Sequence, residues 1–596
     1  MQTKETTVNM KSKLLTLSAI LAVMAVVGFY LQQSQAALFQ YREQQQIFLM
    51  DADYIAGLLK QIGGFATLAA QYLVQFFTNT GAGAVVSSLL ITLTGCFLWL
   101  IVRHINTQII WVPFAIFPAC LQMVYLLDMG YHYEGLIAWL LFAIFLYLYQ
   151  WMADKASLVL RTLIGIVITL LLFVYVGSIA TLFAICAFIY ELLRNPRKSW
   201  ISLAYLAVCF IAAAITVTQG KVVGFDYALW TRGYYEYHIE LGLWQSLAWI
   251  NVPIIMGIAG VVKHIDLKPV LQAMVCLALV LLGGYFICFE SERNTNKDFR
   301  TLAELMNAIN HEDWDEIITY PSLNTGNYLH LNCLNLALSH KDKIMTDLFR
   351  VPQKGAQSLL ASYQAYNDVN VLFSHIYYHT GIISESLCLS FGTMIATPNG
   401  NPSMLKLLVK ERLILGDYDI AEKYITRLER TYSYRDWATS MRRFLYNDAA
   451  VEQDPELGVK RRDLPVDDHR FVVVDGVMAD LMKVIGTNAQ QTSAWEYALG
   501  MLMLEKNMAG IKQLVELPGF SPEIWNGTLP PLVQEAIVTY AENDADYCTA
   551  HGVTPETMQR FQTFRDLALD ARRNNRNQQT ALAQFRGSFW YFYMFT

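Results

Sequence analysis

Long apolar runs fill the first half of the chain and do not recur in the second half. Nine of them are long enough, or nearly long enough, to cross the ~30 Å hydrocarbon core of a bilayer as helices. They cover residues 14–31, 82–102, 109–127, 135–152, 158–174, 179–193, 200–218, 244–262 and 269–289. The pattern predicts a polytopic transmembrane domain over residues 1–289 and a soluble domain over residues 290–596.

Two of these predictions have alternatives. Only Tyr175 to Ser178 separate the fifth run from the sixth, so one long bent helix is an alternative to two spans. Lysines precede the first run, as they do in signal peptides, but its roughly 18 apolar residues exceed the usual 7–15 of a signal-peptide core. We interpret this run as an uncleaved anchor, with a cleaved signal peptide as the alternative.

Positively charged residues fall mainly on one side of the predicted spans. With the N-terminus in the cytoplasm, ten lysines and arginines lie in the inside segments and four lie in the outside loops of this domain. Membrane proteins usually show such an excess on the cytoplasmic side. Nine crossings then place residues 290–596 opposite the N-terminus, which for a bacterial inner (cytoplasmic) membrane means the periplasm.

The soluble half consists of amphipathic helical segments joined by short polar turns. The same helix–turn–helix form recurs at residues 309–318, 338–345, 415–424 and 504–511. The third instance resembles the tetratricopeptide repeat, because Gly416, Tyr418 and Ala421 match that family's turn and second-helix positions, with Leu408 on the preceding helix. The resemblance implies an all-α helical solenoid. Because the spacing between instances is irregular, an irregular helical bundle is the alternative.

Composition excludes some classes of partner and chemistry. The formal charge is -6, and the positive residues form no single basic face, so we expect no nucleic-acid partner. The nine cysteines form neither a disulfide framework nor a CxxC metal site. The chain ends in an aromatic tail at residues 587–596, which we expect to dock into the soluble domain or onto the membrane surface.

Polar residues collect in three predicted outside loops. The first loop contains Glu43, Asp51 and Asp53, the second contains Asp128, and the third contains Arg232. A carboxylate at the membrane boundary can act as a general base or bind a divalent metal, and an arginine can bind a lipid-linked phosphate. We therefore predict that the four acids are catalytic and that Arg232 binds phosphate. The alternative is that all five are ordinary residues of hydrated loops.

The membrane domain resembles the C-type glycosyltransferases, which use polyprenyl-phosphate sugars. The resemblance covers residues 14–243: a long first outside loop with acids and an apolar helical segment at 54–77, then an acid after the third span at Asp128. It implies a lipid-linked sugar as substrate and a divalent cation as cofactor. No Asp-x-Asp pair follows the third span, although Asp51-Ala52-Asp53 has that spacing in the first loop.

The whole chain also resembles a bacterial family of multi-pass membrane proteins of unknown function. The resemblance lies in Glu43–Gln46, Gly63–Gly64, Gln75–Phe77 and the aromatic tail. It implies this architecture and an inner-membrane location, and it implies no activity.

These observations leave two leading functions. One is an inner-membrane scaffold or envelope-assembly factor whose periplasmic helical domain binds a protein or polymer partner. The other is a glycosyltransferase that takes its lipid-linked sugar at the periplasmic face. A transporter comes third, because the spans contain few charges and show no obvious inverted repeat.

Overall fold

The computed structural model describes residues 2–596 except 80, 237–240, 242, 266, 322, 362–366, 398–399, 466–475 and 543. The predicted all-α fold class is confirmed, since the described residues form helices and no named strand. The chain divides into two units. Residues 1–43, 47–296 and 430–433 make up the membrane unit, and residues 44–46, 297–429 and 434–596 make up the helical unit.

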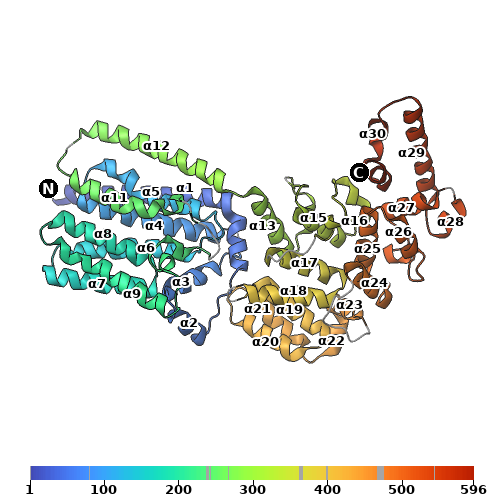
Figure 1. The fold of residues 1–596 in the computed structure, drawn as a ribbon, viewed down its shortest axis with the longest axis horizontal. Coiled ribbons are helices and arrows are strands. Elements are labelled where there is room, and N and C mark those ends of the chain that lie inside the picture. The colour runs from blue at the N-terminus through green and yellow to red at the C-terminus, as the bar shows by residue number, and fades with distance from the viewer. Residues whose placement is uncertain are drawn as a thin grey trace. The chain divides into compact units, whose positions relative to one another are not determined.

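Twelve α-helices form the membrane unit in the part of the chain that the structure describes (Figure 1). Their bounds are α1 Gln2–Gln44, α2 Ala52–Leu59, α3 Gly64–Val74, α4 Ala82–Ile105, α5 Val112–Tyr125, α6 Glu134–Ala153, α7 Leu158–Tyr175, α8 Ile179–Arg194, α9 Leu203–Thr218, α10 Phe225–Leu229, α11 Leu247–Val261 and α12 Pro269–Asn294. The longer ones lie side by side and share one apolar core.

Seven helices of the described chain are long and apolar enough to cross a membrane. They are Leu17–Gln44 of α1, then α4, α6, α7, Ser199–Thr218 around α9, Trp244–Val261 around α11, and α12. Two of the nine expected spans, Ile109–Tyr125, which contains α5, and α8, do not reach the length of the other seven. At 16 residues α8 is about 24 Å long, less than the ~30 Å hydrocarbon core. The count of nine is therefore not confirmed.

The fifth and sixth apolar runs form two separate helices rather than one bent helix. The chain turns between α7 and α8 at Gly177, where φ is 103°. Only glycine adopts such an angle without strain. The two helices pack against each other, which the single-helix alternative would not allow.

Two adjacent glycines divide the apolar segment at residues 54–77 into two helices, α2 and α3. Gly63 precedes α3 with a φ of 77°. A Cβ atom on Gly64 would lie 1.9 Å from the carbonyl oxygen of Leu58, so no larger residue fits this turn. The turn directs α3 onto α6 and α7.

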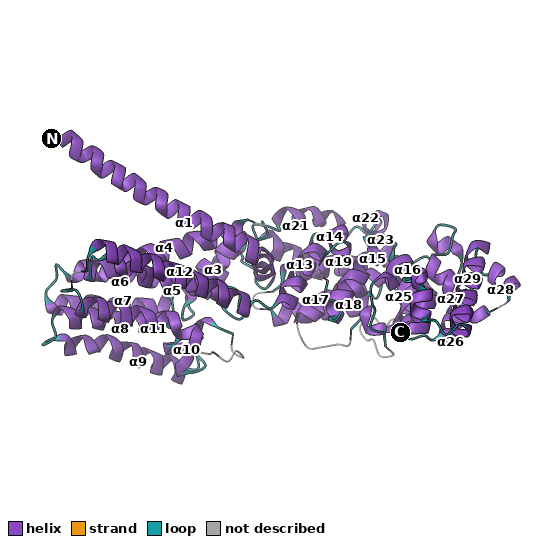
Figure 2. Ribbon diagram, turned by 90° about the horizontal axis from the view of Figure 1, so that it is seen from above, coloured by secondary structure: helices purple, strands orange, loops and turns teal. Residues whose placement is uncertain are grey.

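The outer part of α1 diverges from the other helices of the membrane unit (Figure 2). Val26 is 70% exposed and Phe29 is 69% exposed, whereas Leu31 is fully buried. Of the apolar window of α1, 11% of the residues are buried, and α12 shows the same fraction. Apolar helices with this much open surface are suited to contact with lipid.

The helical unit contains α13 to α31 among the described residues (Figure 1). Their bounds are α13 Lys297–Asn310, α14 Trp314–Ile318, α15 Tyr328–His340, α16 Ile344–Asp347, α17 Asn367–Thr380, α18 Ile383–Ala396, α19 Pro402–Leu415, α20 Tyr418–Glu429, α21 Arg435–Met441, α22 Asp448–Gln453, α23 Leu457–Arg462, α24 Val477–Thr487, α25 Thr492–Leu504, α26 Met508–Val515, α27 Pro531–Ala541, α28 Ala545–Ala550, α29 Pro555–Arg573, α30 Gln578–Ala581 and α31 Phe589–Phe595.

The four recurrent segments of the helical unit each form a helix, a short turn and a second helix. Every one of the four turns contains a residue with a positive φ: Glu312 between α13 and α14, Asp342 between α15 and α16, Gly416 between α19 and α20, and Lys506 between α25 and α26. A left-handed residue reverses the chain and ends the first helix. The tetratricopeptide resemblance and the solenoid remain predictions.

The aromatic C-terminal tail forms α31 and packs into the helical unit, one of the two positions expected for it. The Trp590 side chain is 2% exposed and lies against Phe561 and Phe564 of α29. Its indole Nε1 donates a hydrogen bond to the backbone oxygen of Glu535 at 2.9 Å. The buried indole therefore has both apolar contacts and a polar partner.

Candidate functional site

Asp51 and Asp53, two acids of the segment between α1 and α4, stand at the start of α2. Asp51 is the N-cap of this helix, and its carboxylate accepts hydrogen bonds from the backbone N–H groups of Asp53 and Tyr54. Asp53 itself is exposed in the first turn of α2. Both positions favour a carboxylate for local reasons, because aspartate satisfies free N–H groups and complements the positive end of a helix dipole.

Arg42, at the C-terminal end of α1, organises the loop between α5 and α6. Its guanidinium donates hydrogen bonds to the backbone oxygens of Tyr131 at 2.7 Å, Leu126 at 2.9 Å and Asp128 at 2.8 Å. The arginine is 7% exposed, and the neighbouring Glu43 is 3% exposed. The end of α1, including Glu43, is thereby held against the loop that contains Asp128.

Asp128 lies in a tight turn between α5 and α6. Its Oδ1 accepts a hydrogen bond from the backbone N–H of Gly130 at 3.0 Å. Burial raises the pKa of Asp128 above its ordinary value, although the Gly130 hydrogen bond and the charge of Arg42 lower it in part. A carboxyl group whose pKa is raised in this way is suited to proton transfer.

The loop between α5 and α6 and the loop between α9 and α11, the second and third loops predicted to lie outside, are joined by backbone hydrogen bonds. The N–H of His132 donates to the oxygen of Tyr234, and the N–H of Glu236 donates to the oxygen of Gly130. Arg232, in the third loop, forms an ion pair with Asp226 at 3.0 Å and a hydrogen bond to the hydroxyl of Tyr227 at 3.1 Å. Arg232 is therefore engaged within its own loop.

The structure joins the chain segments that carry two of the predicted site residues, Glu43 and Asp128. Arg42 attaches the end of α1, which carries Glu43, to the backbone of the loop that contains Asp128. Asp51 accepts a hydrogen bond from Arg430 Nη1 at 2.8 Å besides its N-cap bonds, and Arg232 pairs with Asp226. Among the residues that the structure describes, no three His, Cys, Asp or Glu side chains are placed to hold a metal ion. The predicted catalytic and phosphate-binding roles stay predictions.

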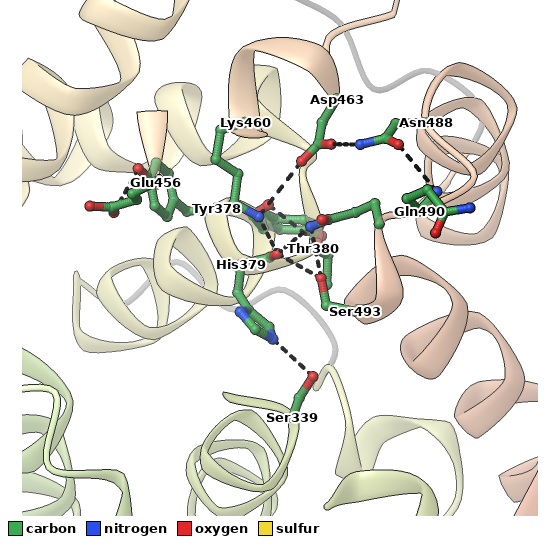
Figure 3. A network of polar contacts seen from close by, with 12 residues as sticks. Ser339, Tyr378, His379, Thr380, Glu456, Lys460, Asp463, Asn488, Gln490 and Ser493 are labelled. Carbon is green, nitrogen blue, oxygen red and sulfur yellow. Dashed lines mark hydrogen bonds and ion pairs between the residues drawn. The ribbon is translucent and has the colours of Figure 1, made fainter. Parts of the chain in front are cut away.

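A buried polar network in the helical unit has no counterpart among the sequence-based candidates (Figure 3). Its centre is the backbone oxygen of His379, at the end of α17. This oxygen accepts hydrogen bonds from Lys460 Nζ at 2.5 Å, Gln491 Nε2 at 3.0 Å and Ser493 Oγ at 2.8 Å. A lysine at the C-terminal end of a helix also complements the helix dipole. One carbonyl group thereby connects α17, α23 and the start of α25.

The same network continues through the side chain of His379. Its Nε2 lies 2.8 Å from Ser339 Oγ on α15, and that hydroxyl donates to Glu496 Oε2 on α25 at 2.7 Å. Ser339 is 3% exposed and Glu496 is 1% exposed. Burial raises the pKa of Glu496 to about 8, although the Ser339 hydrogen bond lowers it in part. The serine lies between the histidine and the glutamate, so the order differs from a Ser-His-acid triad.

Lys460 is the cation of this network. Its Nζ lies 3.8 Å from Asp463 Oδ2, and Asp463 Oδ1 accepts a hydrogen bond from Asn488 Nδ2 at 2.7 Å. Burial lowers the pKa of Lys460 to about 8, although the charges of Asp463 and Glu456 raise it in part. The arrangement joins helices that are far apart in the sequence, and it is suited to fixing how they pack.

Fold and sites together define an all-helical protein with seven apolar helices of membrane-spanning length and a second unit of short paired helices. The model of the Family of unknown function (DUF6057) matches residues 11–596. The chain belongs to that family, which confirms the predicted resemblance of the whole chain to a family of unknown function. No curated protein and no solved structure matches the chain.

Proposed function

We propose that this chain is an integral inner-membrane scaffold or envelope-assembly factor that binds a partner through its helical unit. Two features of the membrane unit support an exported position for that unit. The seven long apolar helices and the nine runs read from the sequence are both odd numbers. An odd number of crossings places the two ends of the chain on opposite sides, and the positive residues favour a cytoplasmic N-terminus.

The surface that carries this proposal is a cleft of 380 Å³ between α29 and α31, which we name the C-terminal cleft. It is lined by Arg565 and Arg572 of α29 and by the side chains of Leu569, Tyr593 and Met594. These three apolar side chains are 44%, 40% and 41% exposed. Exposed apolar groups beside arginines are typical of protein-binding surfaces.

The charge of this region indicates the kind of partner. Residues 555–596 contain six arginines and three acidic residues, within a chain whose net charge is -6. Arg572 is exposed at the cleft. An acidic segment that places one apolar side chain in the cleft and its carboxylates beside Arg565 and Arg572 would match both properties of the surface.

Site-specific photocrosslinking in cells tests this proposal. A photoreactive amino acid at Leu569 or Met594 of the full-length chain is expected to trap a partner. Ile395, an apolar residue on α18 that is 64% exposed, is the matched control and is expected to trap none. The crosslink should disappear in the Arg565→Glu/Arg572→Glu variant, because the surface charge is reversed. Equal crosslinking at Ile395, or none at either cleft position, would contradict the proposal.

A glycosyltransferase is the second candidate, because Arg42 holds Asp128 close to the end of α1 that carries Glu43. In that case Asp128 would transfer a proton at the periplasmic face of the inner membrane, consistent with its raised pKa. Turnover of a lipid-linked sugar by the purified protein, lost in Asp128→Asn and retained in Asp53→Asn, would favour this function. Absence of turnover in the unmodified protein would exclude it for that donor.

A further inference from the structure

A cavity of 510 Å³ lies between α1, α4 and α5 of the membrane unit. Its volume is in the usual range of small-ligand sites. The walls are apolar over most of their length and include Ile20 and Val23 of α1, Ile91 and Trp99 of α4, and Ile116 of α5. Apolar walls of this kind next to helices that face lipid are suited to hold a hydrocarbon chain.

One end of this cavity is polar. Arg103 and Thr107, near the end of α4, and Gln108 line it there. The Arg103 guanidinium lies over the ring of Trp99, 5.0 Å from the ring centre. Both Arg103 and Thr107 are exposed. Among the described residues, no carboxylate forms an ion pair with Arg103, and no acidic residue lines the cavity.

A second cavity in the same unit provides a comparison. It measures 630 Å³ and lies between α1, α5, α11 and α12. Its described lining includes no charged residue, and Asn251 is its main polar group. Two neighbouring cavities thus share an apolar interior next to α1, but only the cavity at Arg103 joins that interior to a cation.

We propose that the cavity at Arg103 is a binding site for one anionic phospholipid. One acyl chain would lie between α1, α4 and α5, against Ile20, Val23 and Ile116. The phosphate would accept charge-assisted hydrogen bonds from the Arg103 guanidinium and a hydrogen bond from the Thr107 hydroxyl. Trp99 holds the guanidinium through a cation–π contact. The site is separate from the C-terminal cleft, so it does not depend on the proposed function.

The chain offers a matched control for the charge. Lys155, after α6, also lies over a tryptophan ring, with its Nζ 3.8 Å from the centre of Trp151. It is likewise a cation at the end of an apolar helix, but it lines neither cavity. A second variant, Cys96→Phe, tests the part of the cavity proposed to hold the acyl chain. It adds a ring at a position that lines the cavity and leaves Arg103 unchanged.

Native mass spectrometry of the full-length protein, incubated with phosphatidylglycerol or phosphatidylcholine, tests the proposal. We expect tighter binding of phosphatidylglycerol, and a loss of that preference by about tenfold or more in Arg103→Gln, as for one charge-assisted hydrogen bond. Cys96→Phe should lose binding of both lipids, and Lys155→Gln should behave as the unmodified protein. Melting temperatures of the variants, measured in the same detergent, show whether each is folded. Equal behaviour of folded Arg103→Gln and Lys155→Gln, or unchanged binding in folded Cys96→Phe, would overturn the proposal.

Discussion

Replacing Glu496 by glutamine should remove one large pH-dependent contribution to the stability of the helical unit. This glutamate is 1% exposed and accepts one hydrogen bond, from Ser339. Burial raises its pKa from 4.5 to about 8. The folded state therefore binds a proton that the unfolded chain has released, over the whole range from about pH 4.5 to about pH 8.

The difference between the pKa of Glu496 in the folded protein and in the unfolded chain sets how stability changes with pH. Because the folded state holds more protons in that range, the free energy of unfolding falls as the pH rises. At 1.36 kcal/mol per pH unit, the change in pKa corresponds to about 5 kcal/mol, fully lost above about pH 8. Glutamine keeps an oxygen that accepts the Ser339 hydrogen bond, and it does not titrate. Between about pH 4.5 and about pH 8, Glu496→Gln should therefore lose about 5 kcal/mol less of its free energy of unfolding than the unmodified protein.

Thermal unfolding of the full-length protein at about pH 5 and about pH 8.5 measures the effect. The unmodified protein also contains Glu411 and Glu535, whose pKa values burial raises to about 7, and His340, His375 and His379, whose pKa values burial lowers. The histidines act in the opposite direction to the glutamates below about pH 6.5, and all five groups are common to every variant. The change in melting temperature between the two pH values should differ by about 10 °C between the unmodified protein and Glu496→Gln, and this difference isolates Glu496. Glu523→Gln, at an exposed position, is the control. If Glu496→Gln shows the same pH dependence as that control, the assignment of a neutral, buried Glu496 is refuted.

Three further substitutions test contacts in the two units. Trp590→Ala should destabilise the helical unit by about 3–5 kcal/mol and expose the C-terminus to protease, whereas Tyr593→Ala, at an exposed position of α31, should do neither. Gly83→Ala should reduce the free energy of unfolding by about 1–3 kcal/mol and lower the melting temperature, because its Cβ would lie 2.5 Å from the buried Phe39 ring. Gly57→Ala, whose Cβ meets open space, should leave the melting temperature nearly unchanged. Arg42→Met should lower the melting temperature, because each buried carbonyl group that it leaves unpaired costs about 1–3 kcal/mol. An unchanged melting temperature would contradict the role of Arg42 in the loop between α5 and α6.

Periodicity predicts most of the helices of this protein, because an apolar stripe and a polar turn are local properties of the sequence. The turn at Gly416 is visible in this way. The turn at Gly63 was not predicted, since the apolar spacing continues on both sides of it and only the paired glycines mark the break. The length of the third span is overestimated, because its apolar run at residues 109–127 extends beyond α5. The run at residues 179–193 matches α8, which is itself short for a membrane span.

Local sequence patterns predict the candidate site less well than they predict the helices. The position of Asp51 before a helix could have predicted an N-cap, and Asp128 followed two residues later by Gly130 could have predicted a turn. The network of Ser339, His379 and Glu496 spans more than 150 residues of sequence, and no local pattern connects its members. Only the packing of α15, α17 and α25 brings these residues together.

The proposed scaffold function depends above all on the side of the membrane that the helical unit occupies. Alkaline phosphatase and green fluorescent protein, each fused after Thr596 and expressed in a bacterium, report that side directly, because the phosphatase is active only outside the cytoplasm. An odd number of crossings with a cytoplasmic N-terminus predicts an active phosphatase and a dark fluorescent protein. A fluorescent fusion with inactive phosphatase would place the helical unit in the cytoplasm and contradict the account.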